Sequence, residues 1–189
     1  DIVIGTYRTG DNISDIIRDL NRVDNGKAWY LHKSGGRYAI QKSRTVSALI
    51  SDERATLSDD VADDHIADAI EDVFDGGRAV VNSKDLENVP DNDDVTVVVK
   101  ADEWDEEEVR TVITNGGSGR TWRNTLVFVQ PTDKVKNSDT VDKGVEIEAA
   151  REVAKDRSLD DGLRETARER ADREQEELRD RIEIKYGEI

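Results

Sequence analysis

The stretch NGGSGRTWRNTLVFVQP, residues 115–131, places glycines and two arginines directly before an apolar segment, a composition suited to phosphate binding. A P-loop runs from a strand through GxxxxGK[ST] into a helix, so that backbone amides, a lysine and a hydroxyl meet phosphate and magnesium. This stretch lacks GK[ST], and its apolar pattern predicts that it leaves a helix and enters a strand. Phosphate would then face the unfavourable carboxyl end of the helix dipole. We therefore predict a connection here, and no nucleotide site of the chain's own.

The two arginines of this stretch remain candidate binding residues. Arg120 and Arg123 can reach a phosphate or a partner's carboxylate, because the guanidinium fork binds such groups through two hydrogen bonds. Arginines that reach in from outside an active site also assist nucleotide hydrolysis. The sequence therefore predicts a phosphate or partner contact at Arg120 and Arg123.

A second candidate site is the one locally basic stretch of the chain. Apolar and polar residues alternate on both sides of KSGG, a pattern that predicts a β-hairpin over residues 28–41. Lys33 and Arg37 belong to the predicted tip and Lys42 follows the second strand. Basic hairpins of this kind bind DNA phosphates or the minor groove, so these three residues are candidate nucleic-acid contacts. Docking onto another protein, or packing within the chain, is the interpretation that we favour for the same hairpin.

The other titratable residues form no recognisable catalytic or metal-binding pattern. The chain has no cysteine and two histidines, His32 and His65. His65 follows Asp64 and lies three residues before Asp68, and we interpret this segment as a solvated helix face rather than a metal site. No metal ligand and no catalytic residue are therefore predicted. An enzyme remains the alternative if a pocket forms at the carboxyl ends of the two strongest strands, where open sheets bind ligands.

Acidic residues dominate the composition, with 44 Asp and Glu against 28 Lys and Arg and a net charge of −16. Such self-repulsion destabilises a compact state, and it is screened where salt shortens the Debye length to roughly 3 Å. The composition therefore predicts adaptation to a salt-rich cytoplasm, as in haloarchaea; an acidic, partly disordered interaction protein is the alternative. No apolar run is long enough to span a membrane. We expect a cytoplasmic protein with no membrane partner.

Hydrophobic periodicity predicts an α/β chain of three domains. Helical stripes around the hairpin make residues 1–57 a partial winged-helix-like module. Residues 58–137 form a small α/β sheet domain: a helix capped by Ser58, strands at 78–82, 95–100 and 124–130, and a helix begun by an Asp105–Glu108 capping box. Continuous apolar strands separated by a helix indicate a mostly parallel sheet covered on both faces. Residues 138–189 are charged helices with a break at 158–162.

Two segments carry a resemblance to a known family. The first is LNRVDNGKAWYLHKSGGRYAIQK, residues 20–42, together with the following Ala48-Leu49-Ile50; the second is GGSGRTWRNTLVFVQP, residues 116–131. They resemble the C-terminal part of the large predicted P-loop ATPases of the domain-of-unknown-function 499 family. The family pattern has proline in GSPR where this chain has Gly119. The chain begins DIVIGTYRTG and contains no methionine, and we expect it to be a piece of a longer protein.

The resemblance implies a function for that longer protein. The family implies an AAA-like ATPase, often encoded beside DNA methyltransferases, helicases or phage-defence genes, with Walker motifs upstream of this region. It implies ATP and magnesium for the parent, no cofactor in this part, and no catalytic residue that can be carried over. We therefore expect a non-catalytic accessory or regulatory part, coupling the upstream ATPase domain to DNA or another defence protein. A stand-alone winged-helix DNA-binding module, or a protein-interaction domain, is the alternative.

Overall fold

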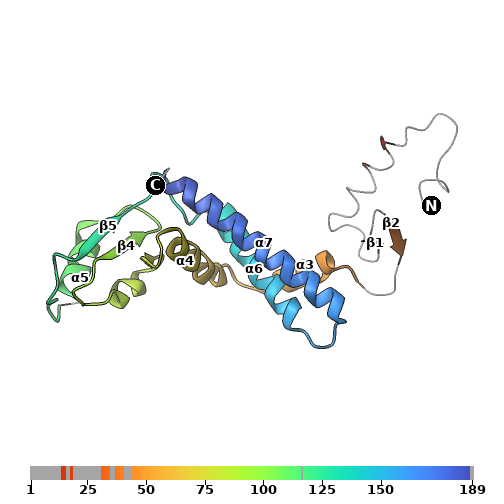
Figure 1. Ribbon diagram of the computed structural model, residues 1–189, viewed down its shortest axis with the longest axis horizontal. Coiled ribbons are helices and arrows are strands. Elements are labelled where there is room, and N and C mark those ends of the chain that lie inside the picture. The colour runs from red at the N-terminus through yellow and green to blue at the C-terminus, as the bar shows by residue number, and fades with distance from the viewer. Residues whose placement is uncertain are drawn as a thin grey trace. The chain divides into compact units, whose positions relative to one another are not determined.

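The structure is a computed structural model that describes residues 14–15, 18, 31–34, 37–40, 44–115 and 117–187 of the chain. These residues have a mixed α/β fold (Figure 1). They form two compact units, one from residues 1–56 and 149–169 and one from residues 57–148 and 170–189. Helices α6 (Ser138–Lys155) and α7 (Asp161–Tyr186) contribute to both units. The three predicted domains stay predictions, because compactness does not establish which parts fold independently.

The first unit contains the predicted hairpin. Strands β1 (Leu31–Ser34) and β2 (Arg37–Ile40) are antiparallel, with Leu31 opposite Ile40 and Ser34 opposite Arg37. This register leaves two residues between the strands, as expected of a tight hairpin with glycines in its turn. The hairpin is therefore confirmed. The helix predicted at residues 11–23 lies largely outside the described residues, although Ser14, Asp15 and Arg18 are helical.

Helix α3 (Val46–Arg54) follows the hairpin, as the apolar pattern predicts. Thr45 is its N-cap, and the Thr45 hydroxyl accepts a hydrogen bond from the Ala48 amide at 3.2 Å. Such a cap satisfies one of the amides that the first turn leaves without a partner. Of the predicted apolar stripe Val46, Leu49, Ile50 and Leu57, Ile50 is buried, Val46 and Leu49 are partly buried, and Leu57 lies beyond the end of α3. The winged-helix assignment of this hairpin and helix remains a prediction.

The second unit is built around a three-stranded parallel sheet of order β3-β4-β5. Its elements are α4 (Ala62–Val73), β3 (Arg78–Val80), the 3-10 helix η2 (Ser83–Asn88), β4 (Thr96–Lys100), α5 (Glu106–Thr114), β5 (Leu126–Val129) and parts of α6 and α7. Val98 lies opposite Arg78 on one side and Phe128 on the other. The predicted parallel pairing is confirmed, and each strand is shorter than its apolar run.

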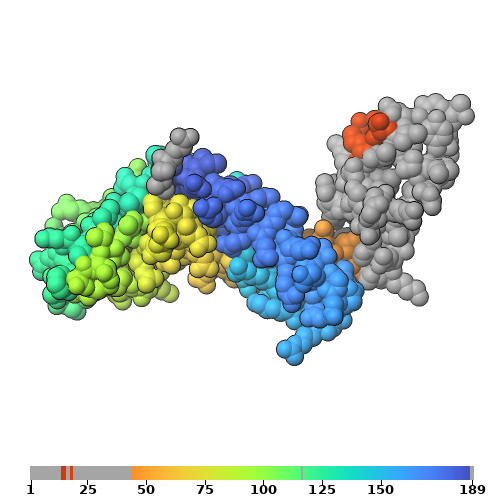
Figure 2. Space-filling view, in the orientation of Figure 1, coloured from red at the N-terminus to blue at the C-terminus, as the bar shows by residue number. Residues whose placement is uncertain are grey.

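Both faces of this sheet are covered, and β4 supplies alternate residues to each. Val98 packs with Val80, Leu86 and Val112 in a cluster on the side of η2 and α5. Val99 belongs to the larger cluster that includes residues of α4, α6 and α7, and Phe74 stacks edge-to-face on Tyr186 at 5.0 Å. Figure 2 shows the yellow surface of α4 against the dark blue end of α7. Alternation along a strand directs successive side chains to opposite faces, so the predicted two-sided burial is confirmed.

The start of the α4 segment differs in one detail from the prediction. Ser58 precedes a short 3-10 turn, Asp59–Val61, rather than α4 itself, and its side chain makes no capping hydrogen bond. The helix stripe is otherwise as predicted, with Ala62, Ile66 and Ile70 fully buried. The capping box of α5 is confirmed, since Asp105 accepts from the Glu108 amide at 2.8 Å and Glu108 accepts from the Asp105 amide at 3.1 Å.

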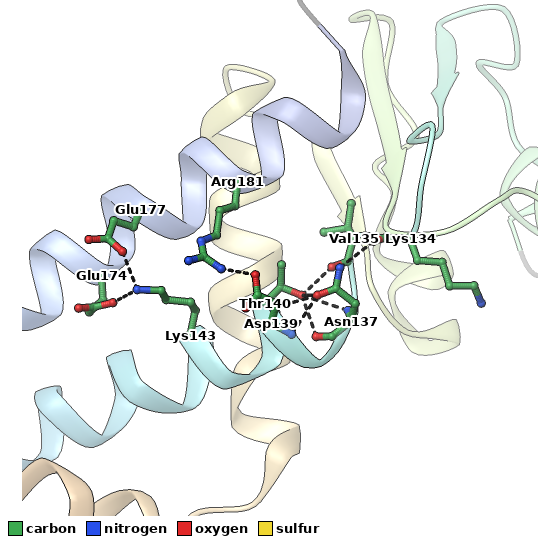
Figure 3. A network of polar contacts seen from close by, with 9 residues as sticks. All are labelled: Lys134, Val135, Asn137, Asp139, Thr140, Lys143, Glu174, Glu177 and Arg181. Atoms are coloured by element: carbon green, nitrogen blue, oxygen red, sulfur yellow. Dashed lines mark hydrogen bonds and ion pairs between the residues drawn. The ribbon is translucent and has the colours of Figure 1, made fainter. Parts of the chain in front are cut away.

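The α6–α7 pair carries charged side chains on its facing surfaces (Figure 3). Lys143 of α6 pairs with Glu174 and Glu177 of α7, the second contact being 2.6 Å. Glu174 is 2 % exposed and also pairs with Arg170 at 2.8 Å. Burial alone would lower the pKa of Lys143, but the two carboxylates together raise it. Each of Lys143 and Glu174 has two partners of opposite charge, which offset the cost of removing these groups from water.

A helix that crosses a membrane needs about 20 largely apolar residues. Within the described ranges, no helix combines that length with that apolarity.

We predict that Gly144→Ala destabilises the second unit by about 1–3 kcal/mol, because it overpacks a helix crossing. A Cβ at Gly144 of α6 would lie 2.6 Å from the Cβ of Ala62, the first residue of α4. Urea unfolding measures the change. Gly162→Ala is the matched control, because its new Cβ meets only the Asp160 side chain, at 3.3 Å. Equal stability of the two variants would contradict the prediction.

Candidate functional site

The glycine-rich stretch connects the end of α5 to the start of β5, as predicted. Asn115 ends the helix in a left-handed conformation, with φ of 51°. Gly117 and Gly119 also have positive φ, which non-glycine residues rarely adopt. Their amides donate to the carbonyl of Thr114, at 3.1 and 2.8 Å, and so cap the carboxyl end of α5. The described amides of Gly117 and Gly119 therefore serve the helix end rather than form a phosphate cradle.

Arg120 lies inside this connection and is 4 % exposed. Its Nε donates to the carbonyl of Val112 at 3.0 Å and its Nη2 to the carbonyl of Val89 at 2.9 Å, while Nη1 donates to the carbonyl of Pro90. One guanidinium thus joins the last turn of α5 to the segment that follows η2. A phosphate contact would require these hydrogen bonds to break. The predicted phosphate or partner contact of Arg120 stays a prediction. The geometry supports a structural role, in which Arg120 joins α5 to the segment after η2.

Asp91 holds the next residues of the loop. Its carboxylate accepts hydrogen bonds from the amides of Thr121 and Trp122, each at 2.9 Å. These two bonds lower the pKa of Asp91 below its ordinary value. The loop is therefore fastened from both sides, by the Arg120 guanidinium and by the Asp91 carboxylate.

Arg123, in contrast, is exposed beside an exposed tryptophan. Trp122 is 46 % exposed, and the Arg123 Nε donates to the carbonyl of Arg120 at 3.3 Å. The two arginines that the sequence grouped together therefore occupy opposite environments. The phosphate or partner contact predicted for Arg123 stays a prediction, and its exposure leaves the side chain accessible to another molecule.

The structure describes only the backbone of Lys33 and Arg37, two of the three predicted nucleic-acid contacts. Lys33 lies opposite Tyr38, and Arg37 lies opposite Ser34, the last pair of the ladder before residues 35 and 36. Lys42 lies outside the described residues. The predicted tip position of Lys33 and Arg37 is confirmed, and their contact with nucleic acid stays a prediction.

The prediction that His65 lies on a solvated helix face is wrong. His65 is 3 % exposed, and its Nε2 lies 2.9 Å from Oε2 of Glu148 on α6. Asp63, two residues earlier on α4, is also buried and lies 2.6 Å from the Lys136 ammonium. Both buried polar side chains of α4 thus have partners more than seventy residues away in the chain. Within the described residues, no group of three or more His, Asp and Glu side chains is arranged to hold a metal ion.

A cavity of about 520 Å³ opens at the carboxyl ends of β4 and β5, where the sequence placed the alternative enzyme site. It is lined by Asp102, Glu103, Trp104, Asp105, Pro131, Thr132, Asp133 and Lys134. Trp104 forms one wall, because its indole donates to the Val129 carbonyl at 2.8 Å and its ring stacks edge-to-face on Phe128.

The charges around this cavity are largely paired with one another. Lys134 contacts Asp102 at 2.8 Å, and Lys185 contacts Asp133 at 2.7 Å. The hydrogen bond from Lys134 lowers the pKa of Asp102, and the same contact raises the pKa of Lys134. The lining contains neither a histidine nor a cysteine. The lowered pKa values of Asp102 and Asp133 favour their charged forms, so the cavity offers ionic contacts.

We predict that Arg120→Ala lowers the free energy of unfolding by about 2–4 kcal/mol, because it leaves three carbonyls without their charged donor. Arg123→Ala is expected to change stability by less than about 0.5 kcal/mol, as for other exposed sites. Arg120→Lys should fall between these, since an ammonium keeps the charge but cannot reproduce the planar fork. Urea unfolding measures the free energy of unfolding of the three variants. Similar stabilities for Arg120→Ala and Arg123→Ala would contradict the structural role.

Comparison with protein families identifies the relatives of this chain. The family model described as the DUF499 third domain matches residues 43–188, and so includes α3, the parallel sheet and both long helices. No curated protein and no solved structure matches the chain. The predicted haloarchaeal origin is not supported by these comparisons and stays a prediction. The family predicted from the sequence motifs is confirmed: the chain belongs to the DUF499 family and contains its third domain.

Proposed function

We propose that this chain is a non-catalytic accessory part of a larger DUF499 ATPase, in which it couples nucleotide state to a partner protein or DNA. The parent would bind ATP and magnesium in its upstream ATPase domain and act in the cytoplasm, in DNA restriction or phage defence. The observation that carries the proposal is that hydrogen bonds of Arg120 and Asp91 hold the loop between α5 and β5 in place. Its buried guanidinium and capped helix end favour a role in presenting Arg123 rather than in holding a nucleotide.

The coupling would act through the rigid position of Arg123. A side chain that is already positioned loses less conformational entropy on binding than one on a mobile loop. Arginine that contacts a transferring phosphoryl group stabilises the charge of the transition state. The Asp91 hydrogen bonds to Thr121 and Trp122 hold the backbone immediately before Arg123 and so support this role.

We predict that Arg123→Ala in the full-length parent lowers kcat for ATP hydrolysis by about a hundredfold or more, as expected for an arginine on the transferring phosphate. The assay is run in molar KCl, because the chain is strongly acidic. Arg110→Ala is the matched control, since Arg110 lies on α5 of the same unit with its side chain 70 % exposed. An unchanged kcat for Arg123→Ala would remove Arg123 from the nucleotide site.

A stand-alone winged-helix DNA-binding module remains the second candidate, favoured by the observed β1–β2 hairpin followed by α3. Lys33, Arg37 and Lys42 would contact the phosphates. We expect duplex binding that weakens with salt, and Arg37→Glu should reduce the salt dependence by about one counterion. Arg179→Glu on α7 makes the same charge change away from the hairpin and is the control. No duplex binding at low salt would exclude this candidate.

A further inference from the structure

The two edge strands of the sheet, β3 and β5, differ in how their outward backbone groups are satisfied. On the β3 side, the Ala79 amide donates to Oε1 of Glu71 at 3.4 Å. The Val81 amide, directly after β3, donates to Oδ2 of Asp85 at 3.0 Å. Side chains that occupy an edge in this way leave little room for another strand. The β3 edge is therefore closed by carboxylates of the same unit.

The β5 edge has no such cover. In a parallel ladder, successive residues direct their backbone groups alternately to one side of the strand and to the other. The Thr96 amide of β4 donates to the Thr125 carbonyl at 2.8 Å, so Thr125 faces β4. By this alternation, Leu126 and Phe128 direct their amides and carbonyls away from β4. Within the part of the chain that the structure describes, no hydrogen bond reaches these outward groups.

β5 also lacks the residues that usually protect an edge strand from pairing. Residues 124–130, NTLVFVQ, contain no charged residue and no proline, in a chain of which 38 % of the residues are charged. Val127 is 47 % exposed, although Val97, opposite it in the ladder, packs against the larger core cluster. The helical cover of this face therefore stops short of β5. An apolar, uncharged edge of this kind is a template for a further strand.

The open groups of β5 match a second copy of the same strand. When two copies of β5 run antiparallel with Val127 opposite Val127, Leu126 of each copy lies opposite Phe128 of the other. Facing residues of this type exchange two hydrogen bonds in an antiparallel ladder. Both outward amides and both outward carbonyls of each copy then have partners. The two exposed valines meet at the centre of the pairing and cover one another.

The charge of the chain favours the same contact. Two copies that each carry a net charge of −16 repel one another, so a contact between them must bring few charges together. In this register, residues 124–130 of the two copies face each other, and no charged side chain lies opposite another. We propose that the chain forms a twofold dimer through antiparallel β5–β5 pairing, which joins the two three-stranded sheets into one. Because the contact is small, the dimer dissociates reversibly.

Disulfide trapping in the full-length protein tests this pairing, which does not depend on the proposed ATPase role. Val127→Cys places one thiol at the centre of the contact. The Cα atoms of such a non-hydrogen-bonded pair are about 4.5 Å apart, within the range that a disulfide spans. A disulfide between position 127 and position 127 necessarily joins two copies, and mass spectrometry identifies it. Val95→Cys is the matched control, because Val95 is 72 % exposed just before β4, one strand away from the contact.

We expect the disulfide at position 127 to form at least about tenfold faster than the one at position 95 under the same mild oxidant, because only position 127 lies within disulfide reach of its copy. Raising KCl from about 0.1 M to about 1 M should increase its yield several-fold, because salt screens the repulsion between two acidic copies. The proposal is overturned if no link forms between two copies at position 127, if the two positions react equally fast, or if position 127 links only to another segment. A yield that falls as KCl rises would also overturn it, since ion pairs would then hold the copies together.

Discussion

The buried guanidinium of Arg120 holds the loop between α5 and β5, and the functional interpretation of the domain depends on this loop. The three carbonyls that Arg120 binds come from the end of α5 and from the segment after η2, so one side chain joins two connections of the sheet. Carbonyls at a helix end need donors, and a buried arginine supplies several at once. Because Arg120 is used inside the fold, the next residues are held in place and Trp122 and Arg123 face outward. The loop therefore exposes the Trp122 and Arg123 side chains and lacks the features of a phosphate-binding turn.

The acidic composition places a second constraint on the fold, because each buried carboxylate needs a cation beside it. Glu174 is nearly inaccessible, yet Lys143 and Arg170 both reach it. The two helices can thus bury a carboxylate between them because cations from both helices reach it. Small residues contribute as well, because Gly144 lets the backbone of α6 approach Ala62 of α4. The two long helices thus combine buried apolar residues, such as Ile147, Leu178 and Ile182, with a few matched charges.

Sequence patterns predicted the elements that depend on local order and missed the contacts that depend on distant residues. The alternation around KSGG, the Asp105–Glu108 capping box and the apolar runs of the strands are short-range patterns, and each has its expected counterpart. His65 was misplaced because its partner, Glu148, lies 83 residues away in the chain. Arg120 and Arg123 could not be separated, since nothing near Arg120 reveals that carbonyls about thirty residues earlier receive it. The cavity beside Trp104 lies at the predicted edge of the sheet, where strand order alone places it.

Hydrogen exchange on the loop amides of the full-length protein tests the central claim most directly, because Thr121 and Trp122 donate to Asp91 only while the loop is closed. The account predicts that both amides exchange slowly without nucleotide and that adding magnesium and ATP leaves their exchange unchanged. Fast exchange of both amides without nucleotide, followed by protection when magnesium and ATP are added, would show instead that the loop closes on phosphate.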